Sequence, residues 1–124
     1  MKNPNEKKFN VEMYQKQNGD KPVEEFLKSL DKKMRSKVTR LIVLLSKEGN
    51  NLREPLSKPI GNGIFELRYQ NKQHPARILY FFYHEGRIIL TNGFIKKTMK
   101  TPRREIKKAN KYMKDFLERQ KDES

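Results

Sequence analysis

Residues 64–69 read IFELRY, residues 77–83 read RILYFFY and residues 87–92 read RIILTN. These three short runs are rich in Ile, Leu, Phe and Tyr, and turn-forming residues at 71–75 and 84–86 separate them. Short apolar runs divided by turn signals are typical of a β-meander. The sequence therefore predicts three consecutive antiparallel strands, of which the second is almost wholly apolar and should be covered on both faces.

Two arginines stand out within these runs, because Arg68 and Arg77 interrupt strands that are otherwise apolar. Side chains alternate between the two faces of a strand, so Glu66 and Arg68 share one face of the first run. A covered guanidinium needs a partner, which is either a carboxylate such as Glu66 or a bound phosphate. We therefore consider an ion pair and a phosphate-binding face as alternatives.

The segment before the meander predicts one strand and two helices. Residues 9–14 alternate between apolar and polar side chains, as a half-buried strand does. Asp20 is placed to cap a helix that has Pro22 in its first turn, and Asp31 is placed to start a second helix that ends at Gly49. Because the connection between these helices is short, we expect an antiparallel helical hairpin.

The rest of the chain predicts a loop and a final helix. Residues 50–62 contain prolines and glycines and are expected to form a loop. Thr101 is placed to cap the last helix, with Pro102 at its first position. The predicted order is β-α-α-β-β-β-α, an α+β fold with a small antiparallel sheet. We expect residues 1–124 to form a single domain, with 120–124 as a frayed tail.

Composition limits the possible functions. The chain carries 29 Lys and Arg against 15 Asp and Glu, a formal net charge of +14, and it has no cysteine. Thiolate metal sites and disulfides are thus excluded. No stretch is long and apolar enough for a membrane span, and residues 1–10 lack the apolar core of a secretory signal, so we expect a cytoplasmic protein without membrane contact.

Positive charge is densest between residues 96 and 114, where nine Lys or Arg accompany one Glu. Such a segment indicates a nucleic acid partner, because each phosphate contact releases a counterion. A solvated surface and a basic membrane-surface segment are the alternatives. Lys96 and Lys97 follow the last strand, where a loop can present them over the sheet. Arg103 and Arg104 lie in a first helical turn, where a bound phosphate would offset the unfavourable dipole.

Other chemistry has less support in the sequence. Phe94 is a candidate stacking surface for an unpaired base, although core packing is the alternative. The two histidines, His74 and His84, lie in turns at opposite ends of one predicted strand and do not converge easily on one phosphate. The His, Asp and Glu residues show no metal-ligand spacing, so we expect neither a metal nor another cofactor.

Four short motifs occur in one order along the chain. They are Leu-x-Lys at 56–58, Glu-Leu-Arg at 66–68, Arg-x-Leu-Tyr at 77–80 and Gly-Phe-x-Lys-Lys-Thr at 93–98. In this order the sequence resembles the RelE/ParE superfamily of toxins over residues 7–117, and within it the phage-derived HigB branch. The resemblance implies a RelE-like fold and an endoribonuclease that cuts mRNA, commonly on the ribosome, and inhibits translation. It also implies a helix-turn-helix HigA-like antitoxin, with operator DNA bound only through the toxin–antitoxin complex.

Cleavage of RNA by its own 2′-hydroxyl would give the candidate residues specific roles. Arg68, Arg77, Lys96 and Lys97 are expected to bind the scissile phosphate and stabilise its transition state, with a lysine as acid and Glu66 as candidate base. Flanking RNA contacts are expected from a further four residues: Lys58, Phe94, Arg103 and Arg104.

This chain departs from several family members in one respect. Those members use a C-terminal histidine or tyrosine, whereas here no histidine follows His84 and Tyr112 lies in the last predicted helix. Two other functions stay open: a ParE-like inhibitor of DNA gyrase that cuts no RNA, and a plain RNA-binding module.

Overall fold

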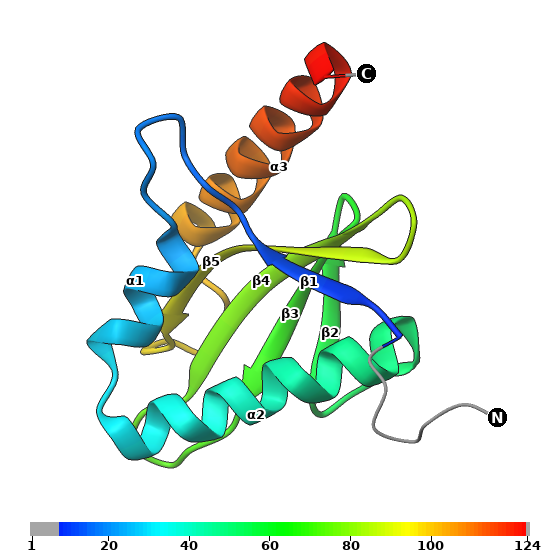
Figure 1. Cartoon of the computed structure of the whole chain (residues 1–124). Helices are drawn as coiled ribbons and strands as arrows, with labels where there is room; N and C mark the ends of the chain where they lie inside the picture. Colours follow the sequence, from blue (N-terminus) through cyan, green and yellow to red (C-terminus); the bar gives the residue numbers. More distant parts are fainter. Residues whose placement is uncertain (1–7, 124) are drawn as a thin grey trace, which may run out of the picture.

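The computed structural model describes residues 8–123 and consists of a five-stranded sheet with helices on both faces (Figure 1). The strands are β1 (Asn10–Met13), β2 (Ser57–Gly61), β3 (Ile64–Tyr69), β4 (Ala76–Tyr83) and β5 (Arg87–Ile95). The helices are α1 (Pro22–Ser29), α2 (Lys32–Glu48), the short 3-10 helix η1 (Gly49–Asn51) and α3 (Arg103–Glu123).

The α+β prediction is confirmed, and the sheet differs from the prediction in two respects. The strand order is β1-β5-β4-β3-β2, and β1 runs parallel to β5 while the other pairs are antiparallel. The sheet is therefore mixed, because residue alternation predicts a strand and not the direction of its partner. In addition, β2 forms within the predicted loop at 50–62. Its Pro59 is tolerated because β2 is an edge strand.

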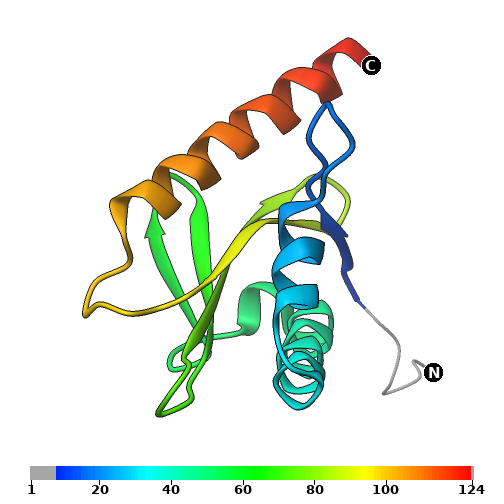
Figure 2. The same ribbon diagram turned by 90° about the vertical axis from the view of Figure 1, so that its left-hand side faces the viewer.

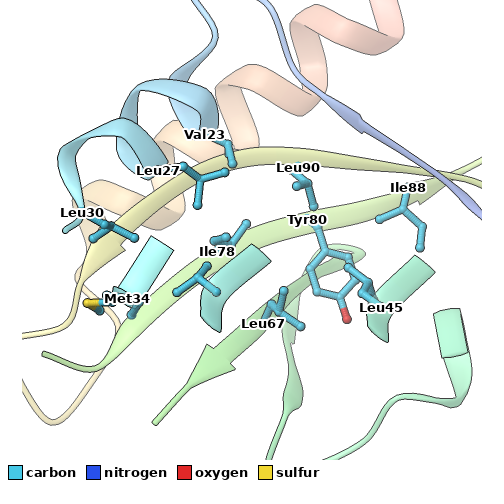
Figure 3. Packing of buried hydrophobic residues seen from close by; sticks show 12 residues of the cluster. Val23, Leu27, Leu30, Met34, Leu45, Leu67, Ile78, Tyr80, Ile88 and Leu90 are labelled. Atoms are coloured by element: carbon cyan, nitrogen blue, oxygen red, sulfur yellow. The ribbon is translucent and has the colours of Figure 1, made fainter. Parts of the chain in front are cut away.

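The main core lies between the sheet and helices α1 and α2. Twelve buried residues form it, including Val23 and Leu27 of α1, Met34 and Leu45 of α2 and Tyr80 of β4 (Figure 3). Strand β4 is buried on both faces along most of its length, as predicted. The two helices cross each other steeply (Figures 1 and 2), whereas the sequence suggested that they lie side by side.

The opposite face of the sheet is covered by α3 over only part of its area. Ala109, Tyr112 and Phe116 of α3 pack against this face, where Phe81 and Ile89 are buried beneath them. A polar network anchors the start of the helix. Asn92 of β5 donates hydrogen bonds from Nδ2 to the main-chain oxygen and to Oε1 of Glu105, each at 3.1 Å. This buried network fixes where α3 begins relative to β5.

The predicted helix ends are confirmed in part. Asp31 caps α2 by accepting a hydrogen bond from the Met34 amide at 2.8 Å, and Gly49 ends that helix. Asp20 does not cap α1, because its carboxylate accepts from Asn18. Nor does Thr101 cap α3, because its hydroxyl donates to Glu66.

Helix α3 itself begins after Pro102, whose carbonyl accepts from the amide of Glu105 at 3.0 Å and from that of Ile106 at 3.2 Å. Of the predicted frayed tail at 120–124, residues 120–123 are helical, and Ser124 lies outside the described residues.

Gly93 of β5 lies where helix α1 packs closely against the strand. A Cβ atom at this position would lie 2.4 Å from Cδ2 of Phe26, a distance that real contacts do not show. The missing side chain therefore lets α1 pack directly onto β5. The strand continues past this contact into the segment that carries Lys96 and Lys97.

Candidate functional site

A buried carboxylate lies between two arginines on the face of the sheet that α3 leaves open. Oε1 of Glu66 is 3.5 Å from Nε of Arg68 and 3.5 Å from Nε of Arg77. The Glu66 and Arg77 side chains are each 3% exposed, whereas that of Arg68 is 20% exposed. The ion pair expected from the sequence therefore forms with both arginines, and only Arg68 reaches the surface.

Strand register explains this cluster. Arg68 of β3 lies directly opposite Arg77 of β4, and Glu66 lies opposite Lys58 of β2. Residues that are direct or diagonal neighbours across paired strands on the same face lie within reach of each other's long side chains. The pattern of alternation thus places four charged side chains on one patch of the sheet.

The Arg77 guanidinium is held by main-chain groups as well as by Glu66. Its Nη1 donates to the carbonyls of Ala76 at 2.9 Å and Tyr69 at 3.3 Å, and its Nη2 donates to Oε1 of Gln70 at 3.2 Å. Burial lowers the pKa of Arg77 and Arg68 lowers it further, while Glu66 opposes both effects. Arg77 therefore forms the support beneath Glu66.

A pocket of about 700 Å³ lies over this patch. The connector between β5 and α3 forms one side of it, and strands β2 and β3 form the other. Its lining consists of Lys58, Ile60, Glu66, Arg68, Lys96, Thr98, Met99, Lys100, Thr101, Pro102, Arg103 and Ile106. Glu66 is the one carboxylate among these residues, against five Lys or Arg, so the pocket favours an anionic ligand.

Thr101 ties the connector to the floor of the pocket. Its hydroxyl donates a hydrogen bond to Oε2 of Glu66, the oxygen that does not face the two arginines. The backbone of Lys96 is fixed independently, because its amide donates to the carbonyl of Pro75 at 2.8 Å. Both ends of the connector are therefore anchored, and its middle residues, Thr98 to Lys100, are exposed.

Lys96 experiences the charges of the whole cluster. Loss of solvent lowers the pKa of its ammonium group, and the nearby Arg77, Arg68 and Lys58 lower it further, while Glu66 raises it. An ammonium group with a lowered pKa gives up its proton more readily near neutral pH. Lys96 therefore has the electrostatic surroundings of a general acid.

Five of the nine predicted site residues line the pocket, Arg77 contacts one of them from below, and the other three lie elsewhere. Lys58, Glu66, Arg68, Lys96 and Arg103 line the pocket. Arg77 lies below it, while Lys97 and Arg104 line a neighbouring hollow of about 430 Å³ on the connector. Phe94 packs against the apolar cluster of Ile64, Leu79 and Ala109. Its surroundings match the core-packing alternative.

The apolar side of the pocket was not predicted from the sequence. Ile60, Met99, Pro102 and Ile106 contribute to the lining, and Met99 is 94% exposed. Only Met99 gave a signal in the sequence, as an apolar side chain within a run of lysines and threonines. Ile60 lies in the segment predicted to be a loop, and Ile106 lies in the predicted last helix. The pocket thus combines cations with an apolar wall, as suits the phosphate and the sugar or base of a nucleotide.

Neither histidine contributes to the pocket. His84 contacts Tyr83 with ring centroids 4.6 Å apart, and the amide of His74 donates to Oδ1 of Asn71 at 3.1 Å in its turn. Within residues 8–123, no three His, Asp or Glu side chains are grouped as a metal site requires. No helix in the same part of the chain has the length and apolar character of a membrane span.

The fold and the pocket together define a class: a small, strongly basic α+β protein with a cationic pocket beside the start of its last helix. Residues 25–114 match the model of a family described as phage derived protein Gp49-like (DUF891), and the chain belongs to this family. That family is a toxin-like, phage-derived family within the RelE/HigB-like toxin group, which indicates a toxin of a toxin–antitoxin system with an antitoxin partner. No curated protein matches the chain.

Proposed function

We propose that this protein is the toxin of a type II toxin–antitoxin system and acts in the cytoplasm as a HigB-like endoribonuclease on mRNA bound to the ribosome. The observation that carries the proposal is the pocket in which Arg68, Lys96, Lys58 and Arg103 surround one buried carboxylate. Membership of the Gp49-like family supports the toxin class. Cleavage of mRNA would stop translation and growth.

The proposed reaction is attack by the 2′-hydroxyl of the RNA on the adjacent phosphorus. A bond forms between O2′ and phosphorus while the bond from phosphorus to O5′ breaks, which leaves a 2′,3′-cyclic phosphate and a 5′-hydroxyl. Arg68 binds the non-bridging oxygens, where its guanidinium stabilises the charge of the transition state. Lys58 and Arg103 bind the flanking phosphates. The scheme uses no metal ion.

Two side chains move the protons in this scheme. Lys96 gives a proton to the leaving O5′, because its pKa is lowered by burial and by neighbouring cations. Glu66 accepts the proton of the 2′-hydroxyl as the one carboxylate of the pocket. A phosphate that draws Arg68 toward itself also frees Oε1 of Glu66 from one of its two arginines.

The other predicted residues act at a distance from the phosphate. Arg77 supports Glu66 and adds to the positive potential at Lys96 without lining the pocket. Lys97 and Arg104 face the neighbouring hollow and extend the positive surface along which RNA leaves the pocket.

Mapping transcript ends after induction tests the proposal. New 5′-hydroxyl ends within coding regions are expected for the wild-type chain, both in cells and on purified translating ribosomes in the presence of EDTA. Arg68→Ala should remove these ends. Lys111→Ala serves as the matched control, because Lys111 is an exposed cation of α3 that does not line the pocket.

Three other outcomes contradict the proposal. Intact transcripts together with DNA breaks or altered supercoiling would indicate gyrase as the target. Tight, salt-sensitive RNA binding without cleavage on translating ribosomes would indicate an RNA-binding module. Cleavage that is lost in EDTA and restored by a divalent ion would remove the metal-independent scheme.

The proposed antitoxin is a HigA-like helix-turn-helix protein encoded beside this gene. Co-expression should restore growth, and only the complex of both proteins should bind operator DNA. A neighbouring gene without such a product, or operator binding by the toxin alone, would contradict this part of the proposal.

A further inference from the structure

Strand β1 forms one edge of the sheet, and its outer side has no neighbouring strand in the described part of the chain (Figure 2). The amides of Asn10 and Tyr14 bond inward to the carbonyls of Gly86 and Leu90, at 2.9 Å each. Alternate residues of a parallel pair bond to the neighbouring strand, so the N–H and C=O groups of Val11 and Met13 point outward. Such an edge is a template for an added strand.

An apolar groove of about 240 Å³ lies beside this edge, between β1 and α2. It is lined by Phe9, Asn10, Val11, Met13, Ile42, Val43, Ser46 and Leu90. Val43 is 37% exposed and is one of three large apolar side chains that are exposed among the described residues. A strand added to β1 would place alternate side chains over this groove.

The helix that borders the groove is strongly basic. Lys32–Glu48 contains six Lys or Arg and one Glu. Arg40 and Lys47 lie three residues before and four residues after Val43, so they share its side of the helix. This charge favours an acidic ligand, and the free main-chain groups favour one that is a polypeptide.

We propose that the outer edge of β1 and the groove beside it bind an extended, acidic segment of a partner protein. The segment adds to the sheet as a sixth strand, inserts an apolar side chain next to Val43, and places its carboxylates against Arg40 and Lys47. RNA would match the charge but has no strand backbone to complete the ladder. The proposal does not depend on nuclease activity, because the groove lies on the face of the sheet opposite to the pocket.

Binding of a synthetic peptide to the full chain tests this proposal. The probe is an eight-residue peptide of alternating Glu and Val with blocked ends, and its binding is measured by fluorescence anisotropy and by amide hydrogen exchange. We expect exchange at the Val11 and Met13 amides to slow at least tenfold on saturation. Val43→Asp should weaken binding at least tenfold.

Leu117→Asp is the matched control, because Leu117 is 36% exposed on α3. Both variants change an exposed side chain, so circular dichroism should show that both remain folded, and the control should bind the peptide like the wild type.

Several results would overturn the proposal. One is equal binding of a peptide whose alternate backbone nitrogens are methylated, since such a peptide cannot complete the ladder. A second is unchanged exchange at Val11 and Met13 despite binding. A third is displacement of the peptide by oligouridylate, together with peptide binding by Val43→Asp that equals that of the wild type. This result would show a general polyanion-binding surface. Self-association without peptide that Val43→Asp abolishes would assign the groove to a second copy of the chain.

Discussion

Two halves of one sheet face differ sharply in this protein. Where α3 covers β3, β4 and β5, most of the residues are apolar, and Leu79, Phe81 and Ile89 are almost completely buried. Beyond the start of α3, the same strands carry Glu66, Arg68 and Arg77, and the connector adds Lys96. The transition occurs within two residues along β4, from Arg77 to Leu79.

This difference shows how the end of one helix defines a site. Residues under α3 gain stability from the removal of apolar surface from water, at roughly 25 cal/mol per Å². Residues of the sheet that lie past the N-terminal end of α3 are not covered by it. They line an open pocket, where charges remain accessible to a ligand. Because Glu66 and Arg77 lie at the border of the core, each requires the other as a partner.

The largest expected effect is on the floor of the pocket. Glu66→Ala should lower the free energy of unfolding by about 3–5 kcal/mol, because it leaves the buried Arg77 guanidinium without its carboxylate. Urea denaturation at pH 7 measures this change. Glu66→Gln should cost less, since the amide oxygen still accepts from Thr101. Equal stability of Glu66→Ala and wild type would show that Arg77 needs no ionic partner.

The next largest effect should be on activity, with little change in the stability of the fold. Arg68→Ala should reduce the rate of RNA cleavage by about 10²–10³-fold, as loss of one transition-state donor does in other enzymes. Its stability should stay within about 1 kcal/mol of wild type, because the Arg68 side chain is partly solvated. Single-turnover cleavage on programmed ribosomes measures the rate, with Lys111→Ala as control. Full activity of Arg68→Ala would remove that residue from the site.

A third change should affect stability only, because it acts where the sheet is covered by α3. Tyr14 donates a hydrogen bond to Oδ2 of Asp115 at 2.6 Å, so β1 is tied to α3. Tyr14→Phe should lower the free energy of unfolding by about 1.5–3 kcal/mol at pH 7, as expected for a hydrogen bond to a charged group, and leave cleavage unchanged. Thermal unfolding and the cleavage assay together check this expectation, and a parallel loss of activity would contradict it.

The same pair gives a specific pH dependence. Burial and the Asp115 carboxylate raise the pKa of Tyr14 to about 12, while the Tyr14 hydrogen bond lowers the pKa of Asp115 below its usual 3.8. The stabilisation from Tyr14 is therefore complete below pH 10 and lost between about 10 and 12. That from Asp115 is present above pH 3.8 and lost as the pH falls further. Tyr14→Phe should flatten both limbs of the stability profile, and an unchanged profile would contradict this linkage.

The smallest effect should be a shift in the pH profile of cleavage. Glu66 raises the pKa of Lys96 against the lowering by burial, Arg77 and Arg68. Glu66→Gln removes the proposed base and slows cleavage. In the residual activity, the alkaline limb of the rate profile should lie at lower pH than in the wild type, because the acid loses its proton earlier. Single-turnover rates measured across the alkaline range check the direction. An alkaline limb at the same pH in Glu66→Gln and in the wild type would exclude Lys96 as the acid.

The sequence predicted best those features that depend only on residues close together in the chain. Alternation placed Glu66 and Arg68 on the same face, and Asp31 and Gly49 marked the two ends of α2. It was less informative where a contact joins distant segments. The prolines and glycines around Lys58 predicted a loop where the structure has the edge strand β2. Thr101 was predicted to cap the last helix, whereas its hydroxyl bonds to Glu66.

The sequence by itself determined the order of the elements other than β2, the excess positive charge and the candidate residues, five of which line the pocket. These follow from periodicity and composition, which are properties of neighbouring residues. Tertiary structure decided that β1 joins β5 in parallel, that Arg77 supports the pocket from below, and that Lys97 and Arg104 face a different hollow from Lys96 and Arg103. Strand pairing and the starting point of α3 fix these outcomes, because both depend on contacts between residues far apart in the chain.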